Sequence, residues 1–554
     1  MKIVRLCILL LIGGLTAACN QSTPSPAVAS AHPAATEAGL AVLEEGGNAF
    51  DAAVAVSATL AVVEPYSSGL GGGGFWLLHE VDTDRNVMID GREKAPQQAR
   101  RDMYLDEQGE VIDGLSMDGP LAAGIPGEPA TLVHLAREYG RLSLSRTLAP
   151  AIRAAREGFA VTPHYQRMAR FRLEVLRRSQ AAAEVFLLDG EVPPLDHVIR
   201  QPDLAATLEQ LARQGSEGFY KGKLAERLVE ETRAAGGIWT REDLRRYQVV
   251  EREPITGSYG DYRIISASPP SSGGVALVSM LNMLEDYDLA AHSAVDRVHL
   301  MIEAMRRAYR DRAEYLGDPD FVEMDIERLT SKAYAARLRQ SIELEQATDS
   351  RMLPPATEST EGNDTTHFSI LDSEGNRVAA TLSVNYPFGS GFMVPGTGVL
   401  LNNEMDDFSA KPGEPNAYGL VGAEANAIEP GKRMLSSMSP TFVEHDDRLA
   451  ILGTPGGSRI ITMVLHGILG FVEGHSAQTI VGSPRYHHQY LPDQVQYEPG
   501  ALTAEQQQEL TRRGHVLREL DNHYGNMQLV IWNRLNNRVE AASDPRGEGL
   551  AVSR

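Results

Sequence analysis

Residues 363–369, Asn-Asp-Thr-Thr-His-Phe-Ser, stand between a loose polar stretch and an alternating strand pattern. A threonine hydroxyl is a weak nucleophile until a base takes its proton, and the free α-amine of the same residue can act as that base. Cleavage of the bond before Thr365 would therefore give one residue both the nucleophile and the base. Thr365 is the candidate catalytic residue of this chain.

The stretch begins a predicted β-hairpin. Its strands are Thr365–Leu371 and Arg377–Asn385, joined by the polar turn 372–376. Pairing centred on the turn places Ser383 opposite Thr365. Because side chains alternate along a strand, Thr381, Ser383 and Asn385 are expected on one face, beside the candidate nucleophile. The preceding segment, 346–363, reads as an exposed linker.

Composition narrows the class of protein. The chain has 554 residues, of which 42% are hydrophobic and 23% charged, as in soluble globular proteins. Its net charge is −22 and no basic stripe offsets it, so nucleic acid is not an expected partner. Both cysteines, Cys7 and Cys19, lie near the start. The remaining chain therefore offers no disulfide, thiolate nucleophile or cysteine metal site.

The first 19 residues read as a secretory signal peptide, with Lys2 and Arg5 before the apolar run Leu6–Leu15. The run is too short to span a bilayer. Residues 15–19, Leu-Thr-Ala-Ala-Cys, also resemble a bacterial lipobox, although the leucine sits four residues before Cys19 where three is usual. We expect export, with the periplasm as the location, and leave lipidation at Cys19 open. Residues 20–32 are expected to form a flexible tether.

The rest of the first half is largely helical in pattern. Two alanine-rich helices are predicted within 34–63, separated by Gly46-Gly47 and with Asn48 capping the second. A glycine run at 71–74 enters a strand and lacks a following Lys-Ser/Thr, so close backbone packing is favoured over a phosphate loop. Further helices are predicted at 132–139, 148–157, 204–213, 224–235 and 294–316, and strands at 86–90 and 262–268.

Several ordered motifs resemble the γ-glutamyltranspeptidases, also called glutathione hydrolases, which are N-terminal nucleophile hydrolases. The likeness runs from about residue 31 to the end of the chain. The matching stretches are Thr-Thr-His-Phe-Ser at 365–369, Leu-Asn-Asn-Glu-Met-Asp-Asp-Phe-Ser at 401–409, Leu-Ser-Ser-Met-Ser-Pro-Thr at 435–441, Gly-Thr-Pro-Gly-Gly-Ser-Arg at 453–459, Pro-Arg-Tyr-His-His-Gln at 484–489, Ala-Ser-Asp-Pro-Arg at 542–546, Glu-Glu-Gly-Gly-Asn-Ala-Phe-Asp-Ala-Ala at 44–53 and Gly-Arg-Glu-Lys-Ala-Pro at 91–96.

The resemblance implies an α+β fold, a four-layer αββα sandwich made from one precursor that cleaves itself before Thr365. A large subunit, 33–364, and a small subunit, 365–554, would then form a heterodimer. The substrates implied are glutathione and related γ-glutamyl compounds. Water, amino acids or dipeptides would accept the γ-glutamyl group from an ester on Thr365, without a cofactor.

The resemblance also assigns the site. Arg92 offers a two-pronged match to the α-carboxylate of the donor, with Ser436 and Ser437 as further donors of hydrogen bonds. Asn385, Glu404 and Asp407 would accept from the α-ammonium, and some relatives have glutamine in place of Glu404. By the same resemblance, the N–H groups of Gly456 and Gly457 would form an oxyanion hole. The hydroxyl of Ser383, where the family more often has threonine, would position the nucleophile. Residues 409–419 would form a lid loop that Tyr418 closes over the donor.

Three histidines and two other functions offer alternatives to this interpretation. Adjacent His487 and His488 face opposite ways on a strand and no third ligand stands out, so a metal site is not expected. His367 is interpreted as structural. The rival functions are a cephalosporin or glutaryl acylase on the same scaffold, and a processing-dead lipoprotein that only binds γ-glutamyl peptides or amino acids.

Overall fold

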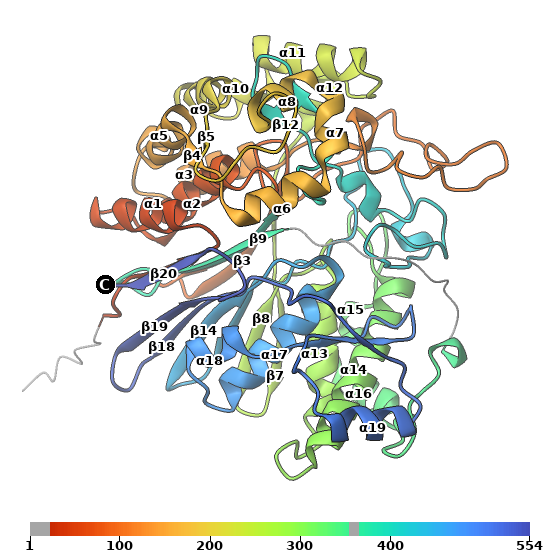
Figure 1. Cartoon of the computed structure of the whole chain (residues 1–554). Helices are drawn as coiled ribbons and strands as arrows, with labels where there is room; N and C mark the ends of the chain where they lie inside the picture. The colour runs from red at the N-terminus through yellow and green to blue at the C-terminus, as the bar shows by residue number, and fades with distance from the viewer. Residues whose placement is uncertain (1–22, 354–364) are drawn as a thin grey trace, which may run out of the picture.

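Two β-sheets packed face to face, each covered by helices on its outer side, make up the protein (Figure 1). This is the expected four-layer αββα arrangement of an α+β protein. The computed structural model describes residues 23–353 and 365–554. The predicted signal peptide, most of the linker 346–363 and the bond between Asp364 and Thr365 lie outside the described residues.

The first sheet joins segments from both ends of the chain. It has seven strands in the order β20 (Leu550–Ser553), β1 (Ala27–Ser30), β9 (Thr366–Leu371), β10 (Arg377–Ser383), β2 (Gly73–Glu80), β3 (Arg85–Gly91) and β6 (Val250–Arg252). Its strand β9 is interior, so the residue just before it, Thr365, is held at the end of a strand that is paired on both sides.

The second sheet has six strands, in the order β19 (Arg538–Ser543), β18 (Gln528–Asn533), β14 (Arg448–Gly453), β13 (Thr441–Glu444), β8 (Tyr262–Ser266) and β7 (Ile255–Tyr259). Fully buried side chains of both sheets interdigitate between them, including Leu77, Leu371, Phe442 and Ile451. Short strands elsewhere pair as β4 (Phe159–Ala160) with β5 (Val198–Ile199), β11 (Met393–Val394) with β12 (Val399–Leu400), and β15 (Tyr486–His487) with β16 (Val495–Tyr497) and β17 (Leu517–Glu519).

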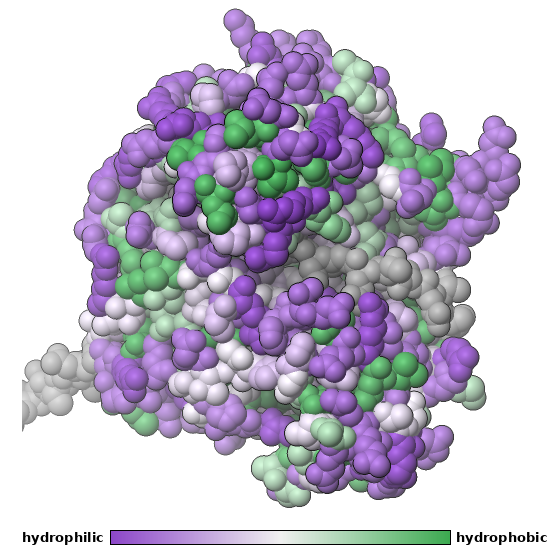
Figure 2. All heavy atoms as spheres, in the orientation of Figure 1, coloured by the Kyte–Doolittle hydropathy of each residue, from purple (hydrophilic) through white to green (hydrophobic). Residues whose placement is uncertain are grey.

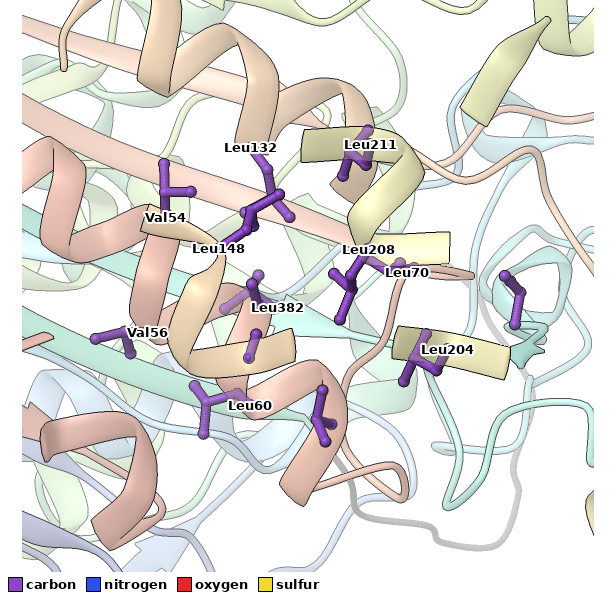
Figure 3. Close-up of a cluster of buried hydrophobic side chains, with 14 of the residues drawn as sticks. Val54, Val56, Leu60, Leu70, Leu132, Leu148, Leu204, Leu208, Leu211 and Leu382 are labelled. Carbon is purple, nitrogen blue, oxygen red and sulfur yellow. The ribbon is translucent and has the colours of Figure 1, made fainter. Parts of the chain in front are cut away.

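Helices from residues 33–246 lie on the outer side of the first sheet, in red to yellow in Figure 1. Figure 3 shows leucines and valines of α2, α3 and α9 pointing toward one another and toward Leu382 of β10. A fully buried leucine contributes about 1.5–3 kcal/mol to folding, so this cluster anchors the helical layer on the hairpin. The helices are α1 (Pro33–Glu44), α2 (Ala49–Val63), α3 (Glu128–Glu138), α4 (Leu144–Thr147), α5 (Ala149–Glu157), α6 (Pro163–Phe171), α7 (Leu173–Arg178), α8 (Gln180–Phe186), α9 (Pro202–Gln214), α10 (Glu217–Tyr220), α11 (Gly222–Ala234) and α12 (Arg241–Arg246).

Helices from residues 273–512 cover the second sheet, in green and blue in Figure 1. They are α13 (Gly273–Leu284), α14 (Ala294–Tyr315), α15 (Ile326–Leu329), α16 (Lys332–Arg339), α17 (Ile460–Val472), α18 (Ala477–Gly482) and α19 (Ala504–Arg512). On the face drawn in Figure 2, hydrophilic residues predominate and hydrophobic ones form small separate patches. Among the described residues, no helix is long and apolar enough to cross a membrane.

The hairpin has the predicted register. Thr366 pairs with Leu382 and Leu371 with Arg377, so the next position along β10, Ser383, falls opposite Thr365. The second strand ends two residues earlier than predicted, because Asn385 adopts φ 75° and turns the chain out of the sheet. Strand alternation therefore does not carry Asn385 to the face of Ser383, as the pattern had suggested; the turn brings it to the site instead.

The glycine run at 71–74 packs against neighbouring backbone, as predicted. A Cβ atom at Gly71 would lie 1.9 Å from the carbonyl oxygen of Leu400, and one at Gly72 would lie 2.1 Å from that of Ser383. Real Cβ atoms never approach so closely. The missing side chains thus allow β2 and its approach segment to press against the strand end that carries Ser383.

The predicted pair of helices is confirmed as α1 and α2, and Asn48 caps α2 in a capping box with Asp51. The predicted tether at 20–32 is wrong from Ala27 onward. Residues 27–30 form β1, fully buried between β9 and β20, and His32 caps α1. Four residues with small side chains carry little strand signal of their own, and their partners lie more than 300 residues away in sequence.

Candidate active site

Thr365 precedes β9 and lines a pocket of about 280 Å³, and the Thr365 residue is only 5% exposed. The pocket is lined by Thr365 together with nine of the ten other predicted site residues: Arg92, Ser383, Asn385, Glu404, Asp407, Tyr418, Ser436, Ser437 and Gly457. Leu420, Met438 and Ile460 add apolar wall that the sequence analysis did not identify. The tenth residue, Gly456, lines a second cavity that Thr365 also lines.

A buried arginine lies at one end of this pocket. Arg92 follows β3 and is 0% exposed. Its guanidinium donates to Glu404 Oε2 at 2.6 Å, forms a short ion pair with Asp407, and lies 3.6 Å from Glu93 Oε2. Its Nε donates to the carbonyl oxygen of Met434 at 3.3 Å. One cation therefore faces three carboxyl groups away from water.

Burial keeps part of this negative charge protonated. It raises the pKa of Glu404 to about 8, although the nearby Arg92 guanidinium opposes the shift. Burial also raises the pKa of Glu93 well above its usual range, and the neighbouring Glu404 adds to that shift. Since a buried carboxylate without full compensation is costly, the proton count of this cluster sets how strongly it attracts a cation.

Two serines bring hydroxyl groups to the same pocket. The main-chain N–H of Ser436 donates to the carbonyl oxygen of Pro270, and its Oγ accepts from Met438 N at 3.1 Å. The Ser437 Oγ is buried and has no hydrogen-bond partner among the described residues. A buried hydroxyl without a partner costs about 1–3 kcal/mol. An anionic ligand beside Arg92 would supply the missing acceptor.

Asn385 and Tyr418 also line the pocket. Asn385 donates its Nδ2 to the carbonyl oxygen of Asn403 at 2.9 Å, which leaves the amide oxygen as the group available to a ligand. The Tyr418 hydroxyl donates to the carbonyl oxygen of Asn385 at 2.7 Å, and Tyr418 is 4% exposed. The predicted lid residue is thus buried in the wall of the pocket and bonded directly to Asn385.

The predicted lid loop is hydrogen bonded to both acids of the pair Asp406-Asp407, a connection that the sequence pattern did not indicate. Asp406 accepts from Ala417 N at 2.9 Å and from Ser116 Oγ at 2.6 Å. Asp407 accepts from Asn416 Nδ2 at 3.2 Å. The sequence shows only that two acids are adjacent. The structure distinguishes them, because Asp406 accepts from the loop residue Ala417 and Asp407 is paired with Arg92.

The two glycines follow β14 and begin the short 3₁₀ turn Gly457–Arg459 that leads into α17: Gly456 caps this turn and Gly457 is its first residue. Gly456 has φ 141° and Gly457 has φ 55°, both in the left-handed region that favours glycine. A Cβ at Gly456 would also lie 2.4 Å from Met463 Cε. The first N–H groups of a helix have no acceptor within it and carry partial positive charge. Such donors beside Thr365 suit an oxyanion.

The predicted structural histidine, His367, hydrogen bonds to Thr381 Oγ1 at 2.8 Å and to Ser369 Oγ at 3.3 Å. Burial lowers its pKa to about 3, so the ring is neutral. It does not line the pocket of Thr365. The other two histidines are also hydrogen bonded. His487 bonds to Thr462 and Gln489, and His488 bonds to Asp493.

One cluster among the described residues has the composition of a metal site: His299, Glu303 and His515. The two rings hydrogen bond to each other at 2.8 Å, and Glu303 is paired with Arg306 and Arg307. Its ligand atoms are therefore already engaged, and none of the three residues lines the pocket of Thr365.

Comparison with known proteins agrees with this geometry. The family described as gamma-glutamyltranspeptidase matches residues 35–553. The chain is 42% identical to the glutathione hydrolase proenzyme of Escherichia coli (strain K12) over 525 residues, 94% of this chain and 90% of that protein.

Solved structures of two kinds share the fold of this chain. The crystal structure of cephalosporin acylase from Bacillus halodurans superposes with a TM-score of 0.83 at 29% identity, covering 96% of each chain. A chain of Helicobacter pylori gamma-glutamyltranspeptidase covers 59% of this chain and 94% of its own length, at 42% identity and a TM-score of 0.58. The protein belongs to the γ-glutamyltranspeptidase family of N-terminal nucleophile hydrolases.

Proposed function

We propose that the protein is a glutathione hydrolase and γ-glutamyltransferase, produced as a precursor that cleaves itself before Thr365. One observation carries the proposal: Thr365 lines the same pocket as Arg92, Asp407 and Ser437. An α-amino acid head group needs a cation and acceptors held close together, and the γ-carbonyl must reach the nucleophile. The names of relatives at about 42% identity support the same activity.

Donor binding rearranges an existing charge cluster. The α-carboxylate takes the guanidinium of Arg92 and the unused hydroxyl of Ser437. The α-ammonium takes Asp407, Glu404 and the amide oxygen of Asn385. The donor brings one positive and one negative charge, so its entry exchanges ion pairs without adding net charge to a buried site. Tyr418 above the pocket excludes water, which strengthens these contacts.

Acyl transfer follows from the placement of Thr365. Its α-amine takes the hydroxyl proton while Oγ attacks the γ-carbonyl carbon, and the N–H groups of Gly456 and Gly457 receive the oxyanion. Such a donor is typically worth about 3 kcal/mol. The amide C–N bond then breaks, the nitrogen leaves with a proton, and the γ-glutamyl group stays as an ester on Thr365. Water or an amine attacks the ester, which predicts ping-pong kinetics.

An acylase for glutaryl or cephalosporin substrates is the rival on the same scaffold, since the structural relative from Bacillus halodurans carries that name. A glutaryl group has the carboxylate but no α-amine. Asp407 and Glu404 beside Arg92 offer two acceptors that such a substrate leaves unused. The lid at 409–419 favours the γ-glutamyl donor as well.

Thr365→Ala removes the nucleophile of both reactions. The purified variant is expected to remain one full-length band on a denaturing gel and to lack γ-glutamyl anilide hydrolysis, whereas wild type gives two bands and Thr365→Ser retains some of both reactions. A Thr365→Ala protein that still matures into two pieces would rule out the assignment, and a wild type that stays whole would favour a binding protein.

Asp407→Asn tests recognition of the ammonium. Hydrogen bonds to charged groups contribute about 1.5–3 kcal/mol, so KM for a γ-glutamyl anilide should rise by roughly tenfold or more. KM for a glutaryl anilide, which lacks the amine, should change far less. If wild type hydrolyses the glutaryl compound better than the γ-glutamyl one, the acylase assignment is correct instead.

Glu404→Gln tests the raised pKa of Glu404. This carboxyl group is protonated below about pH 8 and adds its negative charge only above it. The wild-type to variant ratio of kcat/KM should therefore be near one at pH 6 and rise as pH passes 8. The α-amine of Thr365 and that of the donor cancel in this ratio. A ratio that does not change with pH would show that Glu404 does not titrate in this range.

We propose in addition that residues 1–19 direct export to the periplasm, with Cys19 as a candidate lipid attachment site. The amino-terminal pattern of charge, apolar run and small residues supports this. Cell fractionation of wild type and Cys19→Ala tests both points: a lipoprotein shifts from the membrane to the soluble periplasmic fraction on substitution, and a protein found in the cytoplasm contradicts export.

A further inference from the structure

Thr365 lines two cavities. One is the pocket described above; the other is a larger cleft of about 1690 Å³ that also contains Gly456. An amide has two halves on opposite sides of its carbonyl carbon. If the γ-glutamyl half fills the first pocket, the second cavity lined by Thr365 is the one left for the amine half.

The walls of this cleft come from segments far apart in sequence. Helix α6 supplies His164, Arg167 and Met168, and Figure 1 shows this helix beside the start of β9. The other walls come from residues 522–526 and 545–547, with Glu64 near the nucleophile. Glu64 accepts from the side chain of Thr366 at 2.7 Å, which places its carboxyl group next to the catalytic strand.

The lining of the cleft carries both signs of charge. It includes Glu64, Arg167, Arg546, His164 and His523, and Glu548 lies beside it, since it accepts from His164 N at 3.1 Å. Burial raises the pKa of Glu64 to about 7, so this charge is partly neutralised at neutral pH. The charge available to an anionic ligand therefore depends on which cation has no carboxylate partner.

Of the two arginines, Arg546 is already neutralised. It is bonded to Glu498 at 2.7 Å and to Asp544 at 3.0 Å. Arg167 is exposed, and no carboxylate of the described residues lies within ion-pair distance of it. Its contact is one hydrogen bond of 2.7 Å to His164 Nδ1. Arg167 is therefore held at the cleft with its charge uncompensated.

His164 positions this guanidinium. Burial, with the adjacent arginine, lowers the pKa of His164 to about 4, so the ring is neutral and its Nδ1 accepts from Arg167. The main-chain N–H of His164 donates to Glu548 Oε1 at 3.1 Å, and its ring meets the edge of Tyr66 at 5.1 Å. Because the neutral His164 ring accepts one hydrogen bond and adds no charge, the other N–H groups of Arg167 can donate to a ligand.

We propose that the cleft binds the amine half of the donor, and later the acceptor, as an amino acid or short peptide whose free carboxylate pairs with Arg167. The inference rests on the proposed function, since it assigns the second half of the same amide. It predicts that the enzyme distinguishes leaving groups and acceptors by the presence of a carboxylate.

Arg167→Ala tests the proposal with pairs of substrates that differ in this carboxylate. The kcat/KM for glutathione should fall about three- to tenfold, as expected for loss of one partly exposed ion pair. Hydrolysis of a γ-glutamyl anilide, which has no carboxylate in its leaving group, should stay unchanged. In transfer from the anilide, KM for glycylglycine should rise by a similar factor, and KM for glycylglycinamide should not.

Two further variants control for charge and for folding. Arg167→Lys should retain part of the preference for the carboxylate. Arg170→Ala removes an exposed arginine of the same helix that bonds to Gln166 and does not line the cleft, so it should leave both ratios unchanged. Equal losses on glutathione and anilide in Arg167→Ala, or no loss on either, would overturn the inference. A wild type inactive on both donors would instead overturn the proposed function.

Discussion

The pairing of β9 with β10 is the constraint on which the site depends. Its register sets Ser383 opposite Thr365, and both strands are interior to the seven-stranded sheet. Shifting that register by one residue would turn every side chain of the hairpin to the other face. The hairpin side chains that now pack under α2 and those that now pack between the sheets would then exchange faces, and both apolar layers would be disrupted. The position of the nucleophile is thus held by the apolar layers on both faces of the seven-stranded sheet.

The second constraint is the burial of charge around Arg92. The three carboxyl groups near one guanidinium are largely withdrawn from water. Such a cluster adds little to stability by itself, and apolar residues of similar size would fold at least as well. Under the proposed function its value lies in recognition, because a zwitterionic head group would pair with Arg92, Asp407 and Glu404 together. The raised pKa values of Glu404 and Glu93 limit the cost while the pocket is empty.

Much of this could be predicted from local pattern. The hairpin register follows from alternation about one turn, and the glycine run indicates close packing of strands because no other residue fits there. The pocket residues were found through ordered motifs, since arginine, paired acids and serines have no distinctive spacing of their own. The geometry adds that these segments meet in one place.

Other features depend on contacts that the sequence does not encode locally. Strand β1 is four small residues whose partners are β9 and β20, so it resembled a tether. The turn at Asn385 depends on one left-handed residue after a strand. Nothing in the sequence distinguishes Asp406 from other acids or Arg167 from other exposed arginines. Only the structure shows that Asp406 accepts from Ala417 in the predicted lid loop and that Arg167 is bonded to His164 at the cleft.

Catalysis by Thr365 requires that this residue become the first of a separate chain. Amino-terminal sequencing of the smaller fragment of the purified, active protein tests this requirement. The expected sequence is Thr-Thr-His-Phe-Ser, residues 365–369. A fragment that begins at any other residue, or activity in an unbroken chain, would contradict it.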